Sequence, residues 1–164
     1  MSEPVKDKLQ IRFAVKKDVP LILRFIRELA EYEHMLNLVV ATEDILNEWL
    51  FVKEKAEVII GECDGEPVAY ALFFHNFSTF LGRSGLYLED LYVRPEKRGN
   101  GIGKRMLKYL VELTVERNCG RLEWSCLDWN ANSISFYLSL GAEVLNDWTT
   151  YRLSGDMLSK LAKG

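Results

Sequence analysis

The 164-residue sequence contains no apolar run long enough to span a membrane, and its first residues, MSEPVKDK, lack the apolar stretch of a secretory signal. These absences lead us to expect a cytoplasmic protein that does not bind membranes. The sequence also has no excess of basic residues: its formal net charge of −3 argues against a nucleic-acid partner. A small cationic substrate suits this charge better.

Cysteine is scarce, and the three cysteines, Cys63, Cys119 and Cys126, show no CxxC spacing. This number and spacing indicate neither a disulfide framework nor a zinc site, so we expect no metal. We interpret the cysteines as small buried hydrophobic side chains rather than as a catalytic thiol. The sequence also lacks internal repeats, linkers and low-complexity segments. With 48% apolar residues it is long enough for one well-filled core, and we expect a single domain over residues 1–164.

One stretch, residues 86–104, organises the rest of the chain; it reads LYLEDLYVRPEKRGNGIGK. Residues 86–93 have the composition of a buried strand that ends before Pro95. A turn rich in charge and glycine follows, and from Ile102 apolar residues recur at helical spacing. Such a turn leaves the first N–H groups of the helix pointing outward, where the helix dipole adds partial positive charge. We therefore predict a phosphate-binding site at residues 98–104.

Both strands and helices are expected over the remaining chain. An Asp64-Gly65 hairpin turn joins two antiparallel strands, and the strand behind the long helix is expected to lie parallel to 86–93. The pattern predicts an α/β fold with a mixed, mostly antiparallel sheet of about seven strands flanked by helices. Its strands are expected at 10–15, 56–62, 67–77, 86–93, 121–126, 142–145 and 148–153. Its helices are expected from Asp18 as N-cap to residues 32–34, from Thr42 as N-cap, from Ile102 to about 118, at 130–140 and at 156–162.

Two groups of side chains allow more than one interpretation. Glu28, Glu31 and Glu33 make the end of the first helix acidic, which opposes the helix dipole. Either a bound cation compensates for this charge or the face is simply solvated. Four phenylalanines, Phe73, Phe74, Phe77 and Phe80, have no basic residues between them, which favours a core or dimer surface over a base-stacking platform.

The glycine turn differs from two common phosphate-binding motifs. A Walker loop needs Ser or Thr after its lysine, whereas Arg105 follows Lys104 here. A dinucleotide fingerprint needs a third glycine at a spacing that Gly99, Gly101 and Gly103 do not provide. The remaining pattern is RxxGxG after a strand that ends in Val-x-Pro.

This pattern resembles the pyrophosphate-binding loop of the GNAT superfamily of acyl-CoA-dependent N-acetyltransferases. Within that superfamily, the chain is similar to the spermidine/spermine (diamine) acetyltransferases, which include thialysine acetyltransferases. The similarity is carried by RELAEYE at 27–33, YLEDLYV at 87–93, DWN at 128–130 and FY at 136–137, and it extends from Ile11 to Leu161.

The resemblance implies acetyl-CoA as cosubstrate, a small primary amine as substrate and a homodimer. The residues expected at the cofactor are Leu91, Tyr92, Val93, Arg98, Gly99, Asn100, Gly101, Ile102, Gly103, Lys104, Asn130 and Ser133. The residues expected at the amine are Tyr32, Glu33, Glu89, Asp90, Glu123, Trp124 and Ser125. Together the carboxylates would form an acidic channel that concentrates a polycation.

Acetyl transfer also needs a base, an oxyanion site and an acid. Glu89 lies in an otherwise apolar strand, where a buried carboxylate needs compensation, and we interpret it as the base, acting through a water. A structural ion pair with Arg83 or Arg121 is the alternative. Strand alternation places Asp90 on the opposite face, in substrate attraction or a structural bond. A bulge after Glu89 would free the N–H groups of Leu91 or Val93 for the oxyanion.

By the resemblance, Tyr137 is the general acid that protonates the leaving thiolate, although on sequence alone a packing role fits it as well. Asn130 fits both a helix N-cap and a contact with the pantetheine arm. Two further functions stay open at this point. One is a protein or peptide N-acetyltransferase, and the other is a non-catalytic acyl-CoA sensor.

Overall fold

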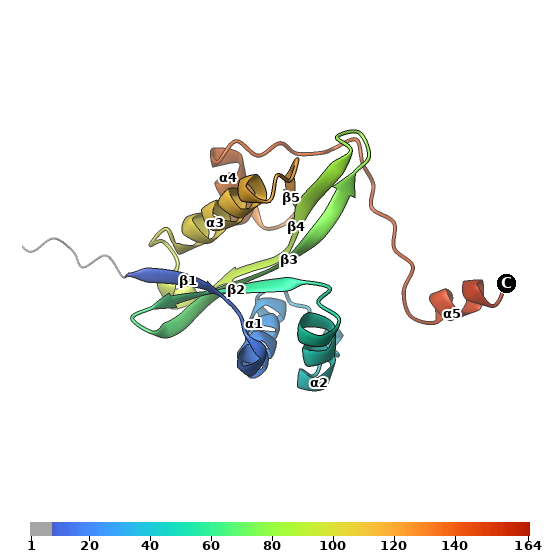
Figure 1. The fold of residues 1–164 in the computed structure, drawn as a ribbon, viewed down its shortest axis with the longest axis horizontal. Coiled ribbons are helices and arrows are strands. Elements are labelled where there is room, and N and C mark those ends of the chain that lie inside the picture. Colours follow the sequence, from blue (N-terminus) through green and yellow to red (C-terminus); the bar gives the residue numbers. More distant parts are fainter. Residues whose placement is uncertain (1–7) are drawn as a thin grey trace, which may run out of the picture. The chain divides into compact units, whose positions relative to one another are not determined.

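The computed structural model describes residues 8–164 (Figure 1). The chain divides into two compact units, one ending at Ser125 and one formed by Cys126–Gly164, and each is described by itself. The expected single domain stays a prediction.

The first unit contains a five-stranded sheet in the order β1-β2-β3-β4-β5. Neighbouring strands are antiparallel except β4 and β5, which are parallel, so the predicted mixed and mostly antiparallel sheet is confirmed. The strands are β1 (Leu9–Phe13), β2 (Glu57–Cys63), β3 (Glu66–Ser78), β4 (Arg83–Val93) and β5 (Leu122–Trp124).

The predicted number of seven strands is wrong. Residues 142–145 and 148–153 form no strand in the part of the chain that the structure describes. An apolar, β-branched composition shows that a segment suits a sheet, but a strand exists only where a neighbour completes its hydrogen-bond ladder. Composition alone could not supply that neighbour.

Helices cover both faces of the sheet in the first unit. Figure 1 shows α1 (Val19–Tyr32) and α2 (Glu43–Asn47) on one face and α3 (Ile102–Glu116) on the other. Short turns of 3-10 helix lie at η1 (Lys16–Asp18), η2 (Leu36–Leu38) and η4 (Pro95–Lys97), and α2 continues into a π-helical turn, η3 (Glu48–Val52). The second unit contains α4 (Ala131–Ser139) and α5 (Asp156–Ala162), at the residues expected for helices.

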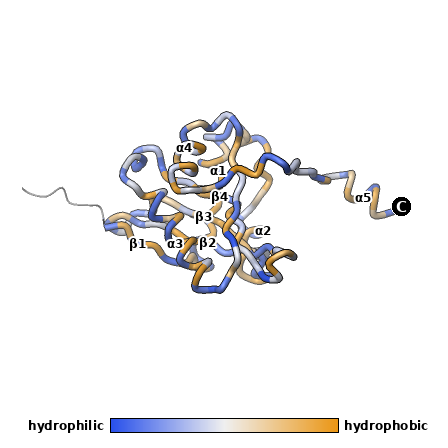
Figure 2. Tube along the Cα trace, turned by 90° about the horizontal axis from the view of Figure 1, so that it is seen from above, coloured by the Kyte–Doolittle hydropathy of each residue, from blue (hydrophilic) through white to orange (hydrophobic). Residues whose placement is uncertain are grey.

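Buried hydrophobic side chains pack against each face of the sheet and form two separate layers of the core. On the α1 face the ring of Phe25 stacks on Tyr70 at a centroid distance of 5.2 Å, and both side chains are fully buried. On the α3 face Met106 and Leu110 are fully buried, and a Cβ added to Gly61 of β2 would lie 2.9 Å from Met106 Sδ. Glycine at this position therefore lets α3 approach the sheet closely. In Figure 2, hydrophilic and hydrophobic residues follow one another at short intervals along the chain.

The β2–β3 hairpin confirms the predicted turn. Asp64 and Gly65 have φ angles of 51° and 80°, as a two-residue type I′ turn requires. Thr42 also caps α2 as predicted, because its Oγ1 accepts the N–H of Ile45 at 3.3 Å. Of the three cysteines, Cys63 is buried as expected, whereas Cys119 and Cys126 are half-buried.

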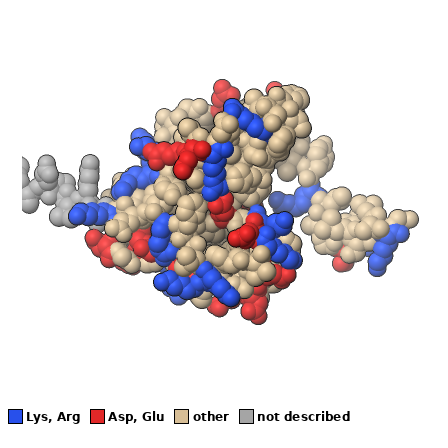
Figure 3. All heavy atoms as spheres, viewed as in Figure 1, with Lys and Arg blue, Asp and Glu red and all other residues tan. Residues whose placement is uncertain are grey.

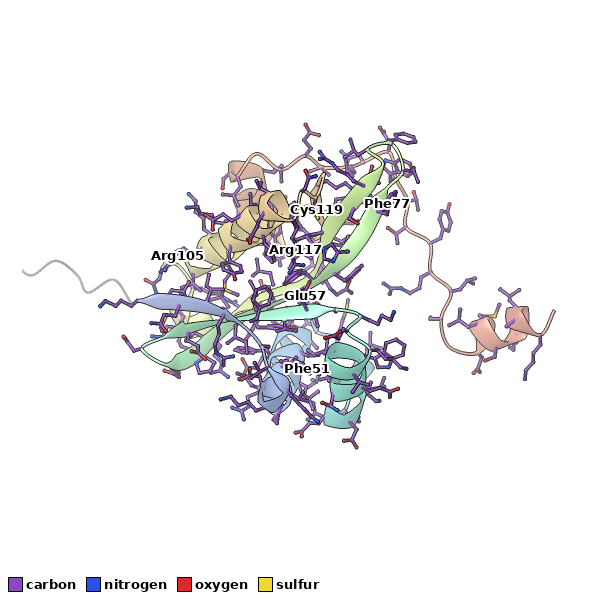
Figure 4. The ribbon with its side chains drawn as sticks, viewed as in Figure 1. Phe51, Glu57, Phe77, Arg105, Arg117 and Cys119 are labelled. Atoms are coloured by element: carbon purple, nitrogen blue, oxygen red, sulfur yellow. The ribbon has the colours of Figure 1, made fainter. Side chains whose placement is uncertain are left out.

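An ion pair fastens the end of α3 to the sheet. Arg117 donates to both carboxylate oxygens of Glu57, at 2.6 and 2.8 Å (Figure 4). This bidentate bond is the chief reason why the pKa of Glu57 lies below its usual value. The pair fixes the helix that carries the glycine turn at its other end.

The side chain of Asp18 does not cap α1, contrary to expectation. Its Oδ2 accepts the N–H of Val15 at 2.8 Å, and both carboxylate oxygens bind Arg12, at 2.8 and 3.0 Å. Asp18 is buried, and the hydrogen bonds from Arg12 lower the pKa of its carboxyl.

Replacing Asp18 with Asn is therefore expected to lower the free energy of unfolding by about 1–3 kcal/mol at pH 7. A carboxyl whose pKa is lower in the folded state stabilises the fold above its unfolded pKa of about 3.9, and this contribution is lost as pH falls below it. Urea unfolding at pH 7 and pH 3 tests this. The two proteins should differ less at pH 3, and an equal difference at both pH values would contradict the expectation.

Candidate active site

A β-bulge interrupts the pairing of β3 with β4 at Glu89. Phe73 pairs with Leu88 and Leu72 pairs with Asp90, so Glu89 is an extra residue opposite this step. The sequence predicts a bulge after Glu89, and the structure places it at Glu89 itself. An extra residue reverses the inward and outward alternation of everything after it, so Asp90 shares the α1 face with Tyr92.

The bulge brings acidic side chains together around one buried hydroxyl. The hydroxyl of Tyr70 on β3 donates to Asp90 Oδ2. Burial, followed by the charge of Asp90 and the hydrogen bond to it, raises the pKa of Tyr70 well above its usual value; Glu33 and Glu89 add to the rise. We call Glu33, Glu89 and Asp90 the acidic cluster.

Two carboxyl groups of the acidic cluster hold their protons more tightly than usual. Burial raises the pKa of Asp90, and the hydrogen bond from Tyr70 opposes this rise. Burial, followed by the charge of Asp90, raises the pKa of Glu33. A cation in this place would relieve both effects, because an opposite charge favours the ionised form of a carboxyl group.

Glu89 departs from one expectation. Its side chain is exposed rather than buried, so desolvation cannot be the reason for its chemistry. Its charge adds to that of Asp90 in raising the pKa of Tyr70. Of the two arginines considered as its partners, Arg121 forms an ion pair with Glu123, and Arg83 donates to Asn118 Oδ1 at 3.0 Å.

The end of α1 holds Glu33 beside the sheet through its backbone. His34 has a φ of 59°, and Met35 N–H donates to the carbonyl of Ala30 at 2.8 Å while His34 N–H donates to Glu31 at 3.1 Å. These are the two bonds of a Schellman motif, which ends a helix at a defined residue. The last turn is also less acidic than its sequence suggests, because Glu28 is paired with Arg94 at 3.0 Å.

The glycine turn ends at the start of α3 as predicted. Gly101 is the N-cap of α3 with a φ of 75°, and no side chain caps the helix there, while Gly99 has a φ of 81°. Both values favour glycine, and the uncapped N–H groups of the 15-residue helix suit an anion. Ile102 is buried beneath the turn, so it anchors the turn to the core, while Asn100 Nδ2 donates to the carbonyl of Lys97 at 3.3 Å.

Arg98 connects this turn to the acidic cluster. Its guanidinium lies over the ring of Tyr32 at 4.6 Å and over the ring of Tyr92 at 5.5 Å, and its Nε donates to the carbonyl of Val93 at 2.8 Å. Because Glu33 follows Tyr32 directly, the predicted phosphate site and the predicted amine site meet at the end of α1.

Replacing Gly101 with Ala is expected to weaken acetyl-CoA binding about tenfold, since a left-handed backbone costs a non-glycine residue about 1–2 kcal/mol. Gly65 is a matched control, because it also has a positive φ, of 80°, and open space around its Cα. Both variants should lose similar stability, and titration calorimetry with acetyl-CoA should distinguish them. Equal cofactor affinity in the two variants would contradict a binding role for the turn.

Beyond the bulge, one edge of β4 has no strand beside it within the described part of the first unit. β5 pairs with Leu86, Tyr87 and Leu88, and its pairing stops there. Arg94 N–H donates to Val68 of β3 at 2.9 Å, so by alternation the N–H groups of Leu91 and Val93 point to the open edge. These are the two donors expected for the oxyanion.

The residues that are expected at the amine and lie on β5 or directly after it also make other bonds. Glu123 is paired with Arg121, and Ser125 Oγ lies 2.9 Å from the hydroxyl of Tyr87. Trp124 is half-buried at the end of the strand. The charge of Glu123 is therefore already balanced by Arg121.

The second unit contains the remaining predicted residues. Asn130 is the N-cap of α4, with its Oδ1 accepting the N–H of Ser133 at 3.3 Å, which confirms the N-cap interpretation. Tyr137 is half-buried two turns further along, next to Phe136. The catalytic and cofactor roles of these residues stay predictions.

Tyr70 is a site residue that was not predicted from the sequence. A signal existed, because Tyr70 is the one polar side chain in the small and apolar run Val68-Ala69-Tyr70-Ala71. A buried tyrosine hydroxyl needs a hydrogen-bond partner, and the partner could be found only from the register of the sheet.

A mixed sheet that carries a glycine turn before a helix, an open strand edge and an acidic cluster defines an acyl-transferase type of α/β protein. Residues 23–142 match the model of the Acetyltransferase (GNAT) family. Thialysine N-epsilon-acetyltransferase of Bos taurus is 37% identical over 168 residues, covering 94% of this chain and 97% of the relative. L-ornithine N5-acetyltransferase NATA1 of Arabidopsis thaliana is 30% identical, covering 94% and 88%.

A solved structure agrees with these relatives. Integron cassette protein VCH_CASS6 of V. cholerae superposes with a TM-score of 0.81 at 27% identity, covering 95% of this chain and 98% of that one. The chain belongs to the acetyltransferase (GNAT) family, and it is an N-acetyltransferase. No helix among residues 8–164 is long and apolar enough to cross a membrane.

Proposed function

We propose that this protein transfers the acetyl group of acetyl-CoA directly to a primary amine of a small cationic substrate, such as a polyamine, a diamine or a lysine-like amine. The observation that carries the proposal is the meeting of the glycine turn and the acidic cluster at Tyr32 and Glu33. A cofactor whose pyrophosphate binds at the glycine turn would extend its pantetheine arm along the open edge of β4, and so bring the thioester toward an ammonium group held at Asp90. The names of the relatives, which include thialysine and L-ornithine acetyltransferases, agree with such a substrate.

The reaction consists of one bond exchange and three proton transfers. The amine nitrogen attacks the thioester carbonyl carbon, and the C–S bond breaks as the new C–N bond forms. An amine with a pKa about three units above neutral must first lose a proton, at a cost of about 4 kcal/mol at pH 7. In our proposal Glu89 accepts this proton through a water, Leu91 and Val93 N–H groups stabilise the oxyanion, and Tyr137 protonates the thiolate. The second proton that the nitrogen loses, as the C–N bond forms, restores the phenol of Tyr137.

A thiol-release assay with acetyl-CoA tests the proposed function. The amines to compare are spermidine, spermine, thialysine, lysine, ornithine, short diamines and a basic peptide, with an amine-free reaction as control. We expect release with at least one small amine and a lower KM for it than for the peptide. Preference for the peptide, or release that is independent of amine, would overturn the proposal.

We also propose a homodimer in a cytoplasmic location. Phe77 and Phe80, at the far end of the β3–β4 hairpin, are 59% and 100% exposed, and Figure 4 shows Phe77 near that end. By contrast, Phe73 is fully buried. The phenylalanines of β3 therefore contribute both to the core and to an exposed apolar surface. Three cysteines without CxxC spacing indicate no disulfide framework, which agrees with a reducing compartment. A monomer in light scattering at micromolar concentration would contradict the dimer.

A further inference from the structure

The hydroxyl of Tyr70 occupies a place where packing alone would favour phenylalanine. The ring is fully buried, lies parallel to Phe25 within 5° and belongs to a cluster that is otherwise apolar except for Tyr92. Burying a hydroxyl in such a cluster costs free energy unless it is bonded. The hydroxyl donates its hydrogen bond to Asp90. The charge of Asp90 acts in turn on Glu33, which follows Tyr32 at the end of α1.

Asp90 needs this bond more than an ordinary surface carboxylate would. Burial favours its neutral form, and the hydrogen bond from Tyr70 favours its charged form. The charged and titratable groups facing this place are Glu33 at the end of α1, Tyr70 on β3 and Glu89 on β4. Tyr70 is the donor among them, and its own pKa is raised so far that it stays protonated.

We propose that Tyr70 is a positioning residue, whose hydroxyl fixes the Asp90 carboxylate in the orientation that receives the ammonium group of the substrate. This inference rests on the proposed function and adds to it a determinant of amine binding that lies outside the substrate pocket itself. The ring supplies rigidity, because stacking on Phe25 fixes where the hydroxyl points. Asp90 then presents its other oxygen, Oδ1, to the cation.

The first test is Tyr70→Phe, which removes the hydroxyl and keeps the ring. We expect the KM for the best amine to rise about tenfold, with kcat changed less and the KM for acetyl-CoA unchanged. Without its donor, Asp90 protonates at a higher pH, so the acidic limb of kcat/KM for the amine should move to higher pH. A role limited to packing would lower stability without moving that limb.

Two comparisons isolate the hydrogen bond. On an Asp90→Asn background, Tyr70→Phe should cause no further change in amine KM or in the acidic limb, because the carboxylate it acts on is gone. Tyr109→Phe on α3, which removes the hydroxyl of a ring that contacts Phe13, should leave both measurements as in the wild-type protein.

A second variant covers the case in which Tyr70→Phe does not fold. Asp90→Glu keeps the charge but moves the carboxylate away from its geometry with Tyr70, and it should raise the amine KM severalfold. An unchanged amine KM in Asp90→Glu, or an unchanged acidic limb in Tyr70→Phe, would overturn the inference while the wild-type protein still acetylates amines. Failure of the wild-type protein with every amine would instead overturn the proposed function.

Discussion

Replacing Tyr137 with Phe is expected to lower kcat about a hundredfold while the affinity for acetyl-CoA stays nearly unchanged. In our proposal the phenol protonates the departing thiolate, and a thiolate that leaves unprotonated is a poorer leaving group. Phe keeps the ring next to Phe136 on α4, so the change is confined to the hydroxyl. Steady-state kinetics and titration calorimetry with acetyl-CoA measure the two quantities.

Tyr151→Phe serves as the matched control for this experiment. Tyr151 belongs to the same unit of the chain, is exposed and has no proposed part in catalysis. It should retain wild-type kcat. Unchanged turnover in Tyr137→Phe would remove the acid role and restore the alternative that Tyr137 only packs.

Replacing Glu89 with Gln is expected to lower the rate by about 10²-fold near neutral pH and progressively less as pH approaches the pKa of the amine. At neutral pH nearly all of the substrate carries an extra proton, and the enzyme must remove it. At high pH the solution has already removed it, so the base matters less. The ratio of wild-type to variant rates from neutral pH up to the pKa of the amine measures this.

The exposure of the Glu89 side chain supports the proposed proton relay through a water. A solvent-accessible carboxylate at a bulge can exchange its proton with water, so a relay through one water fits this position better than a sealed site would. Glu112→Gln, which removes a surface carboxylate paired with Lys108 on α3, is the control and should leave the pH profile unchanged. A wild-type profile in Glu89→Gln as well would show that another group accepts the proton.

Charge on the surface alone does not reveal the site. Figure 3 shows acidic and basic side chains intermixed over the face that it draws. Glu28, Glu57 and Glu123 each face an arginine, so these carboxylates contribute little net attraction for a cation. Asp90 instead accepts a hydrogen bond from the neutral phenol of Tyr70, which favours the ionised form of its carboxyl group.

Local signals in the sequence determined much of this protein. Asp64-Gly65 specified its hairpin because few residue pairs adopt two positive φ angles. Thr42 and Gly101 specified helix starts because each meets a requirement of the backbone itself. The glycine turn is recognisable for the same reason, since its backbone angles depend on residues that are neighbours in the chain.

Pairing between distant segments was decided by tertiary structure. Residues 142–145 and 148–153 looked like strands, yet a ladder needs a partner that composition does not name. The bulge at Glu89 appears only in the register of β3 against β4, and one extra residue reversed the face of every side chain after it. That reversal placed Asp90 against Tyr70 and beside Glu33, residues far apart in sequence, and so formed the acidic cluster.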